Sequence, residues 1–263
     1  MIPARKSEPW NRVIQGDSLR VMKRLPDQSI QLIYLDPPFF TGRIFEGGEH
    51  HFGDRWAGGM ESYLDWLRPR FLEMKRLLTP TGSLLVHLDW HAVHYARVEL
   101  DQIFGMDSFQ NEIIWHYQTG GASKVRFSRK HDNILWYTRS SDDWKFHGER
   151  IRIPRTEKSL HRARNPKGAR IASSDQWKNP QDVLTIPQMN PMAKERTGYP
   201  TQKPEELLRI FVDAFTDPVD VVGDFFCGSG TTPTVAQQMN RRWIASDISK
   251  SAVALTRKRA STQ

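Results

Sequence analysis

Residues 32–39 of the chain read Leu-Ile-Tyr-Leu-Asp-Pro-Pro-Phe. Its first four residues are apolar and end at a breaker, which is typical of a short buried strand. Pro37 and Pro38 lack an N–H and have a fixed φ, so the strand cannot continue through them. Asp36 is therefore expected at the carboxyl end of a strand, the edge of an open α/β sheet where ligands bind.

The residues of this turn suit a planar group that carries an NH2. Asp36 is a hydrogen-bond acceptor, the two prolines offer only carbonyl oxygens, and Phe39 offers a flat ring for stacking. An exocyclic amine of a nucleobase is such a group. The same residues also occur where a strand simply ends in a solvated turn that has no function. This motif alone therefore does not establish a binding site, and a second motif is required.

A second motif lies near the other end of the chain. Residues 219–226 are a predicted strand, and Cys227-Gly228-Ser229-Gly230-Thr231-Thr232 leads from it into a predicted helix. Glycines here allow φ > 0 and a close approach of a ligand to the backbone, and the helix start offers N–H groups to an anion. Asp247 ends the next predicted strand, where it can accept hydrogen bonds from a ribose diol.

The glycine turn also discriminates between cofactors. A dinucleotide needs a third glycine where this chain has Pro233, which counts against NAD and an oxidoreductase. S-adenosylmethionine has a ribose but no pyrophosphate, so a shorter glycine turn is sufficient for it.

Composition limits the remaining classes of protein. The 263 residues carry a formal net charge of +8, which favours a polyanionic partner. The single cysteine, Cys227, excludes an internal disulfide and an all-cysteine metal site. We expect a cytoplasmic protein of a bacterium or phage, because the start of the sequence shows no signal peptide and no apolar run approaches the roughly 18 residues of a membrane helix. The carboxylates near His87, His91 and His94 complete no familiar spacing, so no metal site is predicted.

Apolar periodicity predicts the other elements. We expect helices over 19–25, 61–78, 91–104 and 204–215, and strands over 13–14, 83–88, 111–117, 133–138 and 242–246. Residues 118–130 are basic and contain glycine, and they are predicted to form the bend of an antiparallel pair. Residues 40–59 are rich in Gly and His, which is consistent both with a mobile loop that closes over a substrate and with an ordered surface loop.

The composition becomes strongly basic near residue 145. From 149 to 178 the only acids are Glu149, Glu157 and Asp175, and periodic apolar residues nearly vanish. A solvated surface and a phosphate-contacting surface both fit such a run. The candidate phosphate-contacting residues, which would bind DNA if the partner is DNA, are Arg150, Arg152, Arg155, Lys158, Arg162, Arg164, Lys167 and Arg170.

With both motifs in hand, the chain resembles the amino-methyltransferases of DNA, which methylate N6 of adenine or N4 of cytosine. It is similar to their β group, in which the Asp-Pro-Pro-aromatic motif precedes the cofactor motif, over residues 11–140 and 197–258. Residues 16–19 (Gly-Asp-Ser-Leu) and 201–204 (Thr-Gln-Lys-Pro) also match the group. The resemblance includes the modification enzymes of type II and type III restriction systems. The short chain favours a small stand-alone enzyme.

The resemblance implies an α/β fold of the Rossmann-like class I methyltransferases. This fold has a mostly parallel seven-stranded sheet with helices on both faces and one antiparallel strand near an edge. Residues 1–140 would form the catalytic half, 141–196 a basic target-recognition insertion, and 197–263 the cofactor-binding half. It also implies S-adenosylmethionine as cofactor, DNA as partner, and a possible homodimer or cognate restriction endonuclease.

The resemblance also assigns residues by position. Asp36, Pro37, Pro38 and Phe39 would be catalytic, although the last position is more often Tyr, so a hydroxyl hydrogen bond is lost. Two acids would hold the nucleoside part of the cofactor: Asp17 at the adenine amine and Asp247 at the ribose. Phe226, Gly228 and Gly230 would lie at the methionine end, with Cys227, Ser229 and Thr231 in the same turn. Thr201, Gln202 and Lys203 would lie near the methionine carboxylate.

These residues predict transfer of a methyl group to N6 of a flipped-out adenine. Asp36 would accept one N–H of the amine and the Pro37 carbonyl the other, and the base would stack on Phe39. Asp rather than Ser at the first motif position favours adenine over N4 of cytosine. Two other hypotheses fit the sequence. The chain could methylate an RNA base or a protein amide, or it could be a DNA-binding protein without turnover.

Overall fold

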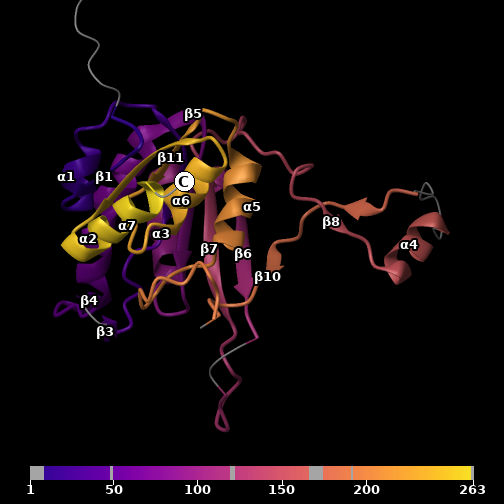
Figure 1. The fold of residues 1–263 in the computed structure, drawn as a ribbon, viewed down its shortest axis with the longest axis horizontal. Helices are drawn as coiled ribbons and strands as arrows, with labels where there is room; N and C mark the ends of the chain where they lie inside the picture. The colour runs from indigo at the N-terminus through magenta and orange to yellow at the C-terminus, as the bar shows by residue number, and fades with distance from the viewer. Residues whose placement is uncertain (1–8, 48–49, 119–121, 166–173, 191, 262–263) are drawn as a thin grey trace, which may run out of the picture.

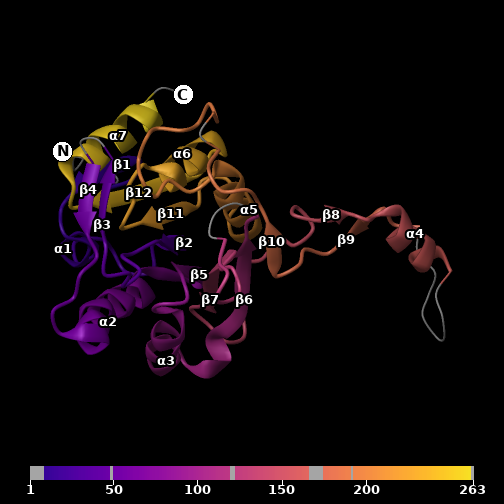
Figure 2. The same cartoon turned by 90° about the horizontal axis from the view of Figure 1, so that it is seen from below.

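The computed structural model describes residues 9–47, 50–118, 122–165, 174–190 and 192–261, and one mixed sheet organises them (Figures 1 and 2). Its eight strands are, in spatial order, β1 (Arg12–Gln15), β12 (Arg242–Asp247), β11 (Val221–Asp224), β2 (Ile30–Leu35), β5 (Leu78–Leu88), β7 (His131–Thr138), β6 (Phe109–His116) and β10 (Val183–Thr185). Every neighbouring pair is parallel except those of β7, which is antiparallel to both β5 and β6.

Helices cover both faces of the sheet (Figure 2). One face carries α1 (Ser18–Met22), α2 (Gly59–Leu77) and α3 (Val93–Phe104), and the other carries α5 (Glu205–Phe215), α6 (Thr231–Gln238) and α7 (Lys250–Ser261). Strand β2 is buried along its whole length because it has a core on each side: Ile33 and Leu35 pack into one core, and Leu32 and Tyr34 into the other. The α/β fold with a mostly parallel sheet is confirmed.

The sheet brings the two motifs together. Strands β2 and β11 are parallel neighbours, with Leu32 opposite Val222 and Ile33 opposite Gly223. Their carboxyl ends therefore lie side by side, and β12 ends next to β11 on the same edge. The chain order reverses between β11 and β2, which is where ligands bind in open α/β sheets.

Two details differ from the predicted architecture. The sheet has eight strands where seven were expected, because Val183–Thr185 of the predicted insertion pairs with Ile114–His116 of β6. Residues 40–59 are not one irregular loop, because β3 (Ile44–Gly47) and β4 (His50–Gly53) form an antiparallel pair within them.

The basic insertion forms an arm that projects from the body (Figures 1 and 2). Its described elements are β8 (Ile153–Pro154), α4 (Glu157–Arg164) and β9 (Trp177–Lys178), and β8 pairs with β9. Thr156 caps α4 by accepting a hydrogen bond from the Ser159 N–H.

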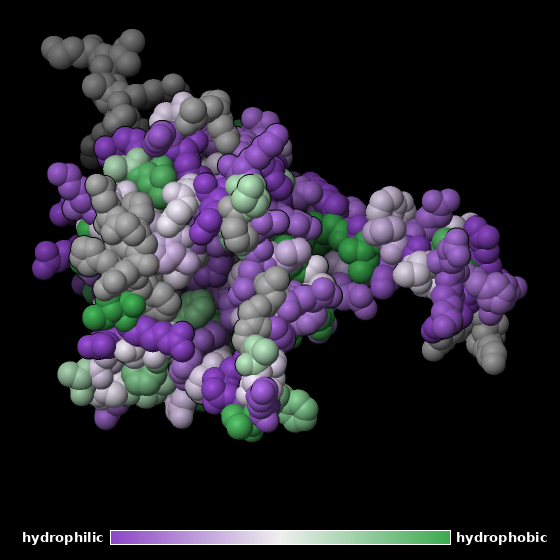
Figure 3. All heavy atoms as spheres, turned by 60° about the horizontal axis from the view of Figure 1, so that its bottom comes forward, coloured by the Kyte–Doolittle hydropathy of each residue, from purple (hydrophilic) through white to green (hydrophobic). Residues whose placement is uncertain are grey.

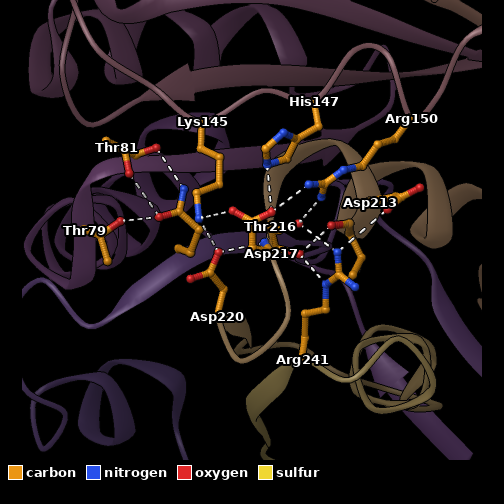
Figure 4. A network of polar contacts seen from close by, with 12 residues as sticks. Thr79, Thr81, Lys145, His147, Arg150, Asp213, Thr216, Asp217, Asp220 and Arg241 are labelled. Atoms are coloured by element: carbon orange, nitrogen blue, oxygen red, sulfur yellow. Dashed lines mark hydrogen bonds and ion pairs between the residues drawn. The ribbon is translucent and has the colours of Figure 1, made fainter.

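Ion pairs fasten the start of the arm to the body (Figure 4). Lys145 Nζ lies 2.8 Å from Asp217 and 2.6 Å from Asp220, just before β11. Arg150 reaches the same Asp217 at 2.8 Å and donates to the Thr216 carbonyl. The attachment therefore lies at the amino end of β11, away from the edge that carries the motifs. Among the described residues, no helix combines the length and apolarity that crossing a membrane requires.

Candidate active site at the carboxyl edge of the sheet

A cavity of about 920 Å³ lies where β2, β11 and β12 end. It brings together residues from both motifs that are almost 200 positions apart in sequence. The predicted site residues among those that line it are Asp36, Pro37, Pro38, Phe39, Thr201, Lys203, Phe226, Cys227, Gly228, Ser229, Thr231 and Asp247. Lining residues that the sequence did not single out include Trp66, Tyr199, Asp224 and Ile248.

Lys203 and Asp36 form an ion pair inside this cavity. Lys203 Nζ donates to both carboxylate oxygens of Asp36, at 2.8 and 2.6 Å, and the two side chains are only 12% and 17% exposed. The same ammonium lies 5.2 Å from the centre of the Phe39 ring. Lys203 therefore compensates the charge of the acceptor that the sequence identified, and each carboxylate oxygen still has a lone pair for a second donor.

A buried carboxylate outside the motif holds the turn that follows Phe39. Asp54 is 1% exposed and accepts hydrogen bonds from the N–H groups of Phe40 (3.0 Å) and Thr41 (2.7 Å) and from the indole of Trp56 (3.1 Å). Phe40 has a φ of +64°, a conformation that non-glycine residues rarely adopt. Asp54 thus stabilises a strained backbone directly behind the motif.

Tyr63 of α2 holds the motif from the other side. Its hydroxyl donates to the Pro38 carbonyl at 2.6 Å, and its ring packs against Phe40 and Trp56. Because Pro38 uses its carbonyl oxygen in this way, the Pro37 carbonyl is the motif's other candidate acceptor.

A polar chain runs beneath the Phe39 ring. The fully buried His87 has its ring 5.6 Å from Phe39, and its Nδ1 lies 2.6 Å from the Tyr34 hydroxyl. Its Nε2 lies 3.2 Å from Asp132, which also accepts from the Tyr117 hydroxyl at 3.0 Å. Burial acts to raise the pKa of Asp132, but the hydrogen bond from His87 helps hold that pKa below its ordinary value. Both ring nitrogens of His87 therefore have hydrogen-bond partners within the protein, which is typical of a structural histidine.

The glycine turn has the geometry that the sequence predicted. Gly230 has a φ of +77° and precedes the first residue of α6, and a Cβ there would lie 2.6 Å from Thr256 Oγ1. Asp247 accepts from the N–H groups of Gly228 (2.9 Å) and Ser249 (2.8 Å), and burial raises its pKa. Gly230 lies behind the turn and does not line the cavity.

Asp224, the last residue of β11, is a buried acid on the cavity wall. Burial raises its pKa to about 7, although the Thr232 side chain and the Phe226 N–H both donate to it. Burial also raises the pKa of the neighbouring Cys227 thiol, which is therefore protonated and a poor nucleophile.

Besides Gly230, two predicted cofactor residues, Asp17 and Gln202, lie outside the cavity lining. Asp17 caps α1 and pairs with Arg70 at 2.5 Å, and the Arg70 guanidinium lies 3.8 Å from the centre of the Trp66 ring. Arg70 therefore links Asp17 to Trp66, which lines the cavity. The buried Gln202 bonds to residues 195 and 197, which holds the segment before α5.

The candidate DNA-binding residues divide into two groups. Arg150 is bound to Asp217, and Arg152 and Arg155 both donate to the Trp177 carbonyl within the arm. The exposed cations of α4 are Lys158, Arg162 and Arg164. Lys167 and Arg170 lie outside the described residues.

The buried Asp54 gives a stability prediction. Asp54→Ala would leave the N–H groups of Phe40 and Thr41 without their acceptor, so we expect a loss of about 2–4 kcal/mol in the free energy of unfolding. Urea denaturation measures it. Asp142→Ala, which truncates an exposed acid, is the control and should change the value by less than about 0.5 kcal/mol. Equal effects of the two variants would contradict the role of Asp54.

Asp224 gives a prediction for pH. The folded state keeps a proton on Asp224 up to about pH 7, whereas the unfolded chain releases it near the ordinary pKa of 3.8. Asp224 therefore lowers the free energy of unfolding as pH rises from about 4 to about 7, by up to about 4 kcal/mol. Asp224→Asn should remove this part of the pH dependence in denaturation curves. An unchanged slope in the variant would show that Asp224 is already ionised in the folded protein.

Comparison with known proteins agrees with this geometry. The family model described as DNA methylase, of the N6/N4 type, matches residues 30–258. The type II methyltransferase M.HpaI of Haemophilus parainfluenzae is 30% identical over 253 residues, covering 96% of this chain and 74% of its own. The DNA adenine methyltransferase YhdJ of Escherichia coli K12 is 27% identical over 247 residues, covering 94% and 81%.

Solved structures share the fold. The cytosine-N4-specific PvuII DNA methyltransferase superposes with a TM-score of 0.69 at 20% identity, covering 94% of this chain and 85% of its own. The TTHA0409 protein of Thermus thermophilus, solved in complex with S-adenosyl-L-methionine, has a TM-score of 0.61 at 22% identity, covering 96% and 93%. With the family match over residues 30–258, the chain belongs to the N6/N4 family of DNA methylases.

Proposed function

We propose that this DNA methyltransferase acts on N6 of adenine, with S-adenosylmethionine as methyl donor. The observation that carries the proposal is that Asp36 and Phe39 line the same cavity as the glycine turn and Asp247. Asp rather than Ser at the first motif position favours adenine. The relative from E. coli is named a DNA adenine methyltransferase, whereas PvuII is named cytosine-N4-specific, so N4 of cytosine is the second candidate.

The cavity suits S-adenosylmethionine together with a base. Its volume of about 920 Å³ is at the upper end of the range for small-molecule sites. Asp247 would receive the ribose hydroxyls, and Ile248, which is 75% exposed on the cavity wall, would cover the adenine ring. The glycine turn would let the methionine end approach the backbone. When bound, the cofactor supplies an electrophilic methyl group.

The chain's own residues prepare the nitrogen of the target amine. This amine is a poor nucleophile because its lone pair is conjugated with the ring. Asp36 accepts one N–H and the Pro37 carbonyl accepts the other, which favours a tetrahedral nitrogen and frees the lone pair for attack. The nitrogen would gain the methyl group as the methyl–sulfur bond breaks with its electron pair on sulfur, and it would then lose one proton by way of Asp36. Phe39 stacks on the base and offsets part of the few kcal/mol that flipping costs.

Lys203 positions the Asp36 carboxylate in this mechanism. It orients the Asp36 carboxylate through two hydrogen bonds, so that the carboxylate is ready to accept before the substrate arrives. Its position beside Asp36 also leaves it within the cavity for the methionine carboxylate, the role assigned by resemblance.

DNA contact is proposed for the arm. Lys158, Arg162 and Arg164 lie exposed on α4, which projects from the body and can reach phosphates that the body cannot (Figure 1). M.HpaI and M.BglII are named type II methyltransferases, so a restriction endonuclease of the same specificity is a proposed partner. A homodimer stays a prediction.

The first test replaces the acceptor of the motif. Asp36→Ala should lower methyl transfer to unmethylated genomic DNA by about 10²–10⁴-fold, because the amine loses its acceptor. Nucleoside mass spectrometry measures the product, and calorimetry checks that S-adenosylmethionine still binds. The control, Asp107→Ala, truncates an exposed acid beside the start of β6, at the opposite edge.

The outcomes of this test separate the possibilities. N6-methyladenine from the unaltered protein supports the proposal, and N4-methylcytosine would keep the mechanism but overturn the choice of base. Full activity of Asp36→Ala would overturn the mechanism. An unaltered protein that binds the cofactor but modifies no DNA would overturn the function.

A second test concerns the arm. The triple variant Lys158→Ala, Arg162→Ala, Arg164→Ala should weaken DNA binding and reduce the slope of log K against log[salt] by up to about 3, because about one counterion is released per phosphate contact. The control, Lys23→Ala with Arg24→Ala, removes exposed cations between α1 and β2, at the edge away from the motifs, and should leave the slope unchanged. Equal slopes for the triple variant and the unaltered protein, measured by fluorescence anisotropy, would contradict the role of α4.

A further inference from the structure

The turn between β6 and β7 carries two strongly exposed apolar side chains. Phe127 is 99% exposed and Val125 is 91% exposed, and they alternate with the exposed cations Lys124 and Arg126. The turn projects below the body in Figure 1, and Figure 3 shows hydrophobic and hydrophilic side chains gathered on this projection. Removing a phenylalanine side chain from water is favourable, so Phe127 on this projecting tip is available to bury its ring against a partner.

This turn lies on the same edge as the active site. Because β7 is antiparallel to β5, the β6–β7 turn lies where β2 and β5 end. Strand β7 is two positions from β2 in the sheet, a distance of about 10 Å. Arg129 fixes the turn against this edge, since its guanidinium lies 3.4 Å from the centre of the Trp90 ring, two residues after β5.

Hydrogen bonds close the turn beneath its tip. The Ser123 N–H donates to the Ser128 hydroxyl at 3.2 Å, and the Tyr117 N–H donates to the Lys130 carbonyl at 2.8 Å. Residues 124–127 therefore form a tip on a closed base. No acid occurs from residue 118 to residue 130, whereas four lysines or arginines do.

Duplex DNA offers what this tip requires. Its phosphates pair with cations, and its stacked bases accept an apolar ring between them. A base that leaves the duplex for the cavity also leaves a gap in the stack, and a side chain that fills the gap stabilises the flipped state.

We infer that residues 124–127 form a wedge that enters the duplex beside the flipped base. Phe127 stacks on a base exposed by flipping, and Lys124 and Arg126 contact the flanking phosphates. The inference rests on the proposed function, because it assigns the step that opens the duplex for that reaction.

The experiment compares Phe127→Ala with the unaltered protein on two duplexes. Both contain the sequence that is found methylated in genomic DNA, and in one of them the target base lies opposite an abasic site, where flipping costs less. We expect the variant to lose about tenfold or more in kcat/KM on the fully paired duplex and less than about threefold on the abasic one. Phe127→Trp should restore activity on the paired duplex, because it keeps a stacking ring.

Controls distinguish the wedge from general effects. Met106→Ala removes another exposed apolar side chain, 73% exposed and at the opposite edge, and should change neither rate. Thermal unfolding checks that Phe127→Ala is as stable as the unaltered protein. If the variant equals the unaltered protein on both duplexes, or is equally impaired on both, the wedge is overturned. If the unaltered protein methylates no DNA, the proposed function fails instead.

Discussion

The parallel pairing of β2 with β11 is the constraint on which the site depends. It joins residues 30–35 to residues 221–224 and places the carboxyl ends of both strands on one edge. The acceptor Asp36 then follows one strand, and the glycine turn follows the other. The Lys203–Asp36 ion pair, formed across 167 positions, lies in the cavity that this pairing creates. The two motifs line one cavity because these two strands are neighbours.

The sequence predicted most of the sheet and half of the site, and the reason is local. Asp36, Gly228 and Asp247 lie at strand ends that their own neighbours define through apolar runs, breakers and glycines. The antiparallel pair β6 and β7, with a basic bend between them, was expected from the same signals. The resemblance supplied the mostly parallel sheet with one antiparallel strand near an edge, which periodicity alone does not give, and the structure supplied the order of the strands.

The rest depends on contacts between distant segments. Asp54 supports the motif because β3 and β4 bring it back to Phe40, and nothing near Asp54 in the sequence indicates this. Arg150 belongs by composition to a basic run, yet Asp217 holds it at the root of the arm. Asp17 is a cofactor residue by resemblance, and the structure adds that its carboxylate caps α1 and pairs with Arg70. In each case the contacts of the side chain involve a residue that is distant in the sequence, and the fold brings the two residues together.

The two outer strands of the sheet also have a consequence for self-association. Strand β1 has four residues and β10 has three, and each is the last strand on its side. Backbone groups at a sheet edge invite another chain to add a strand, and short edge strands limit the number of hydrogen bonds that such an addition can form. Because β10 follows the arm in the chain and pairs with β6, this short strand also shields the longer strand β6 from aggregation by edge pairing.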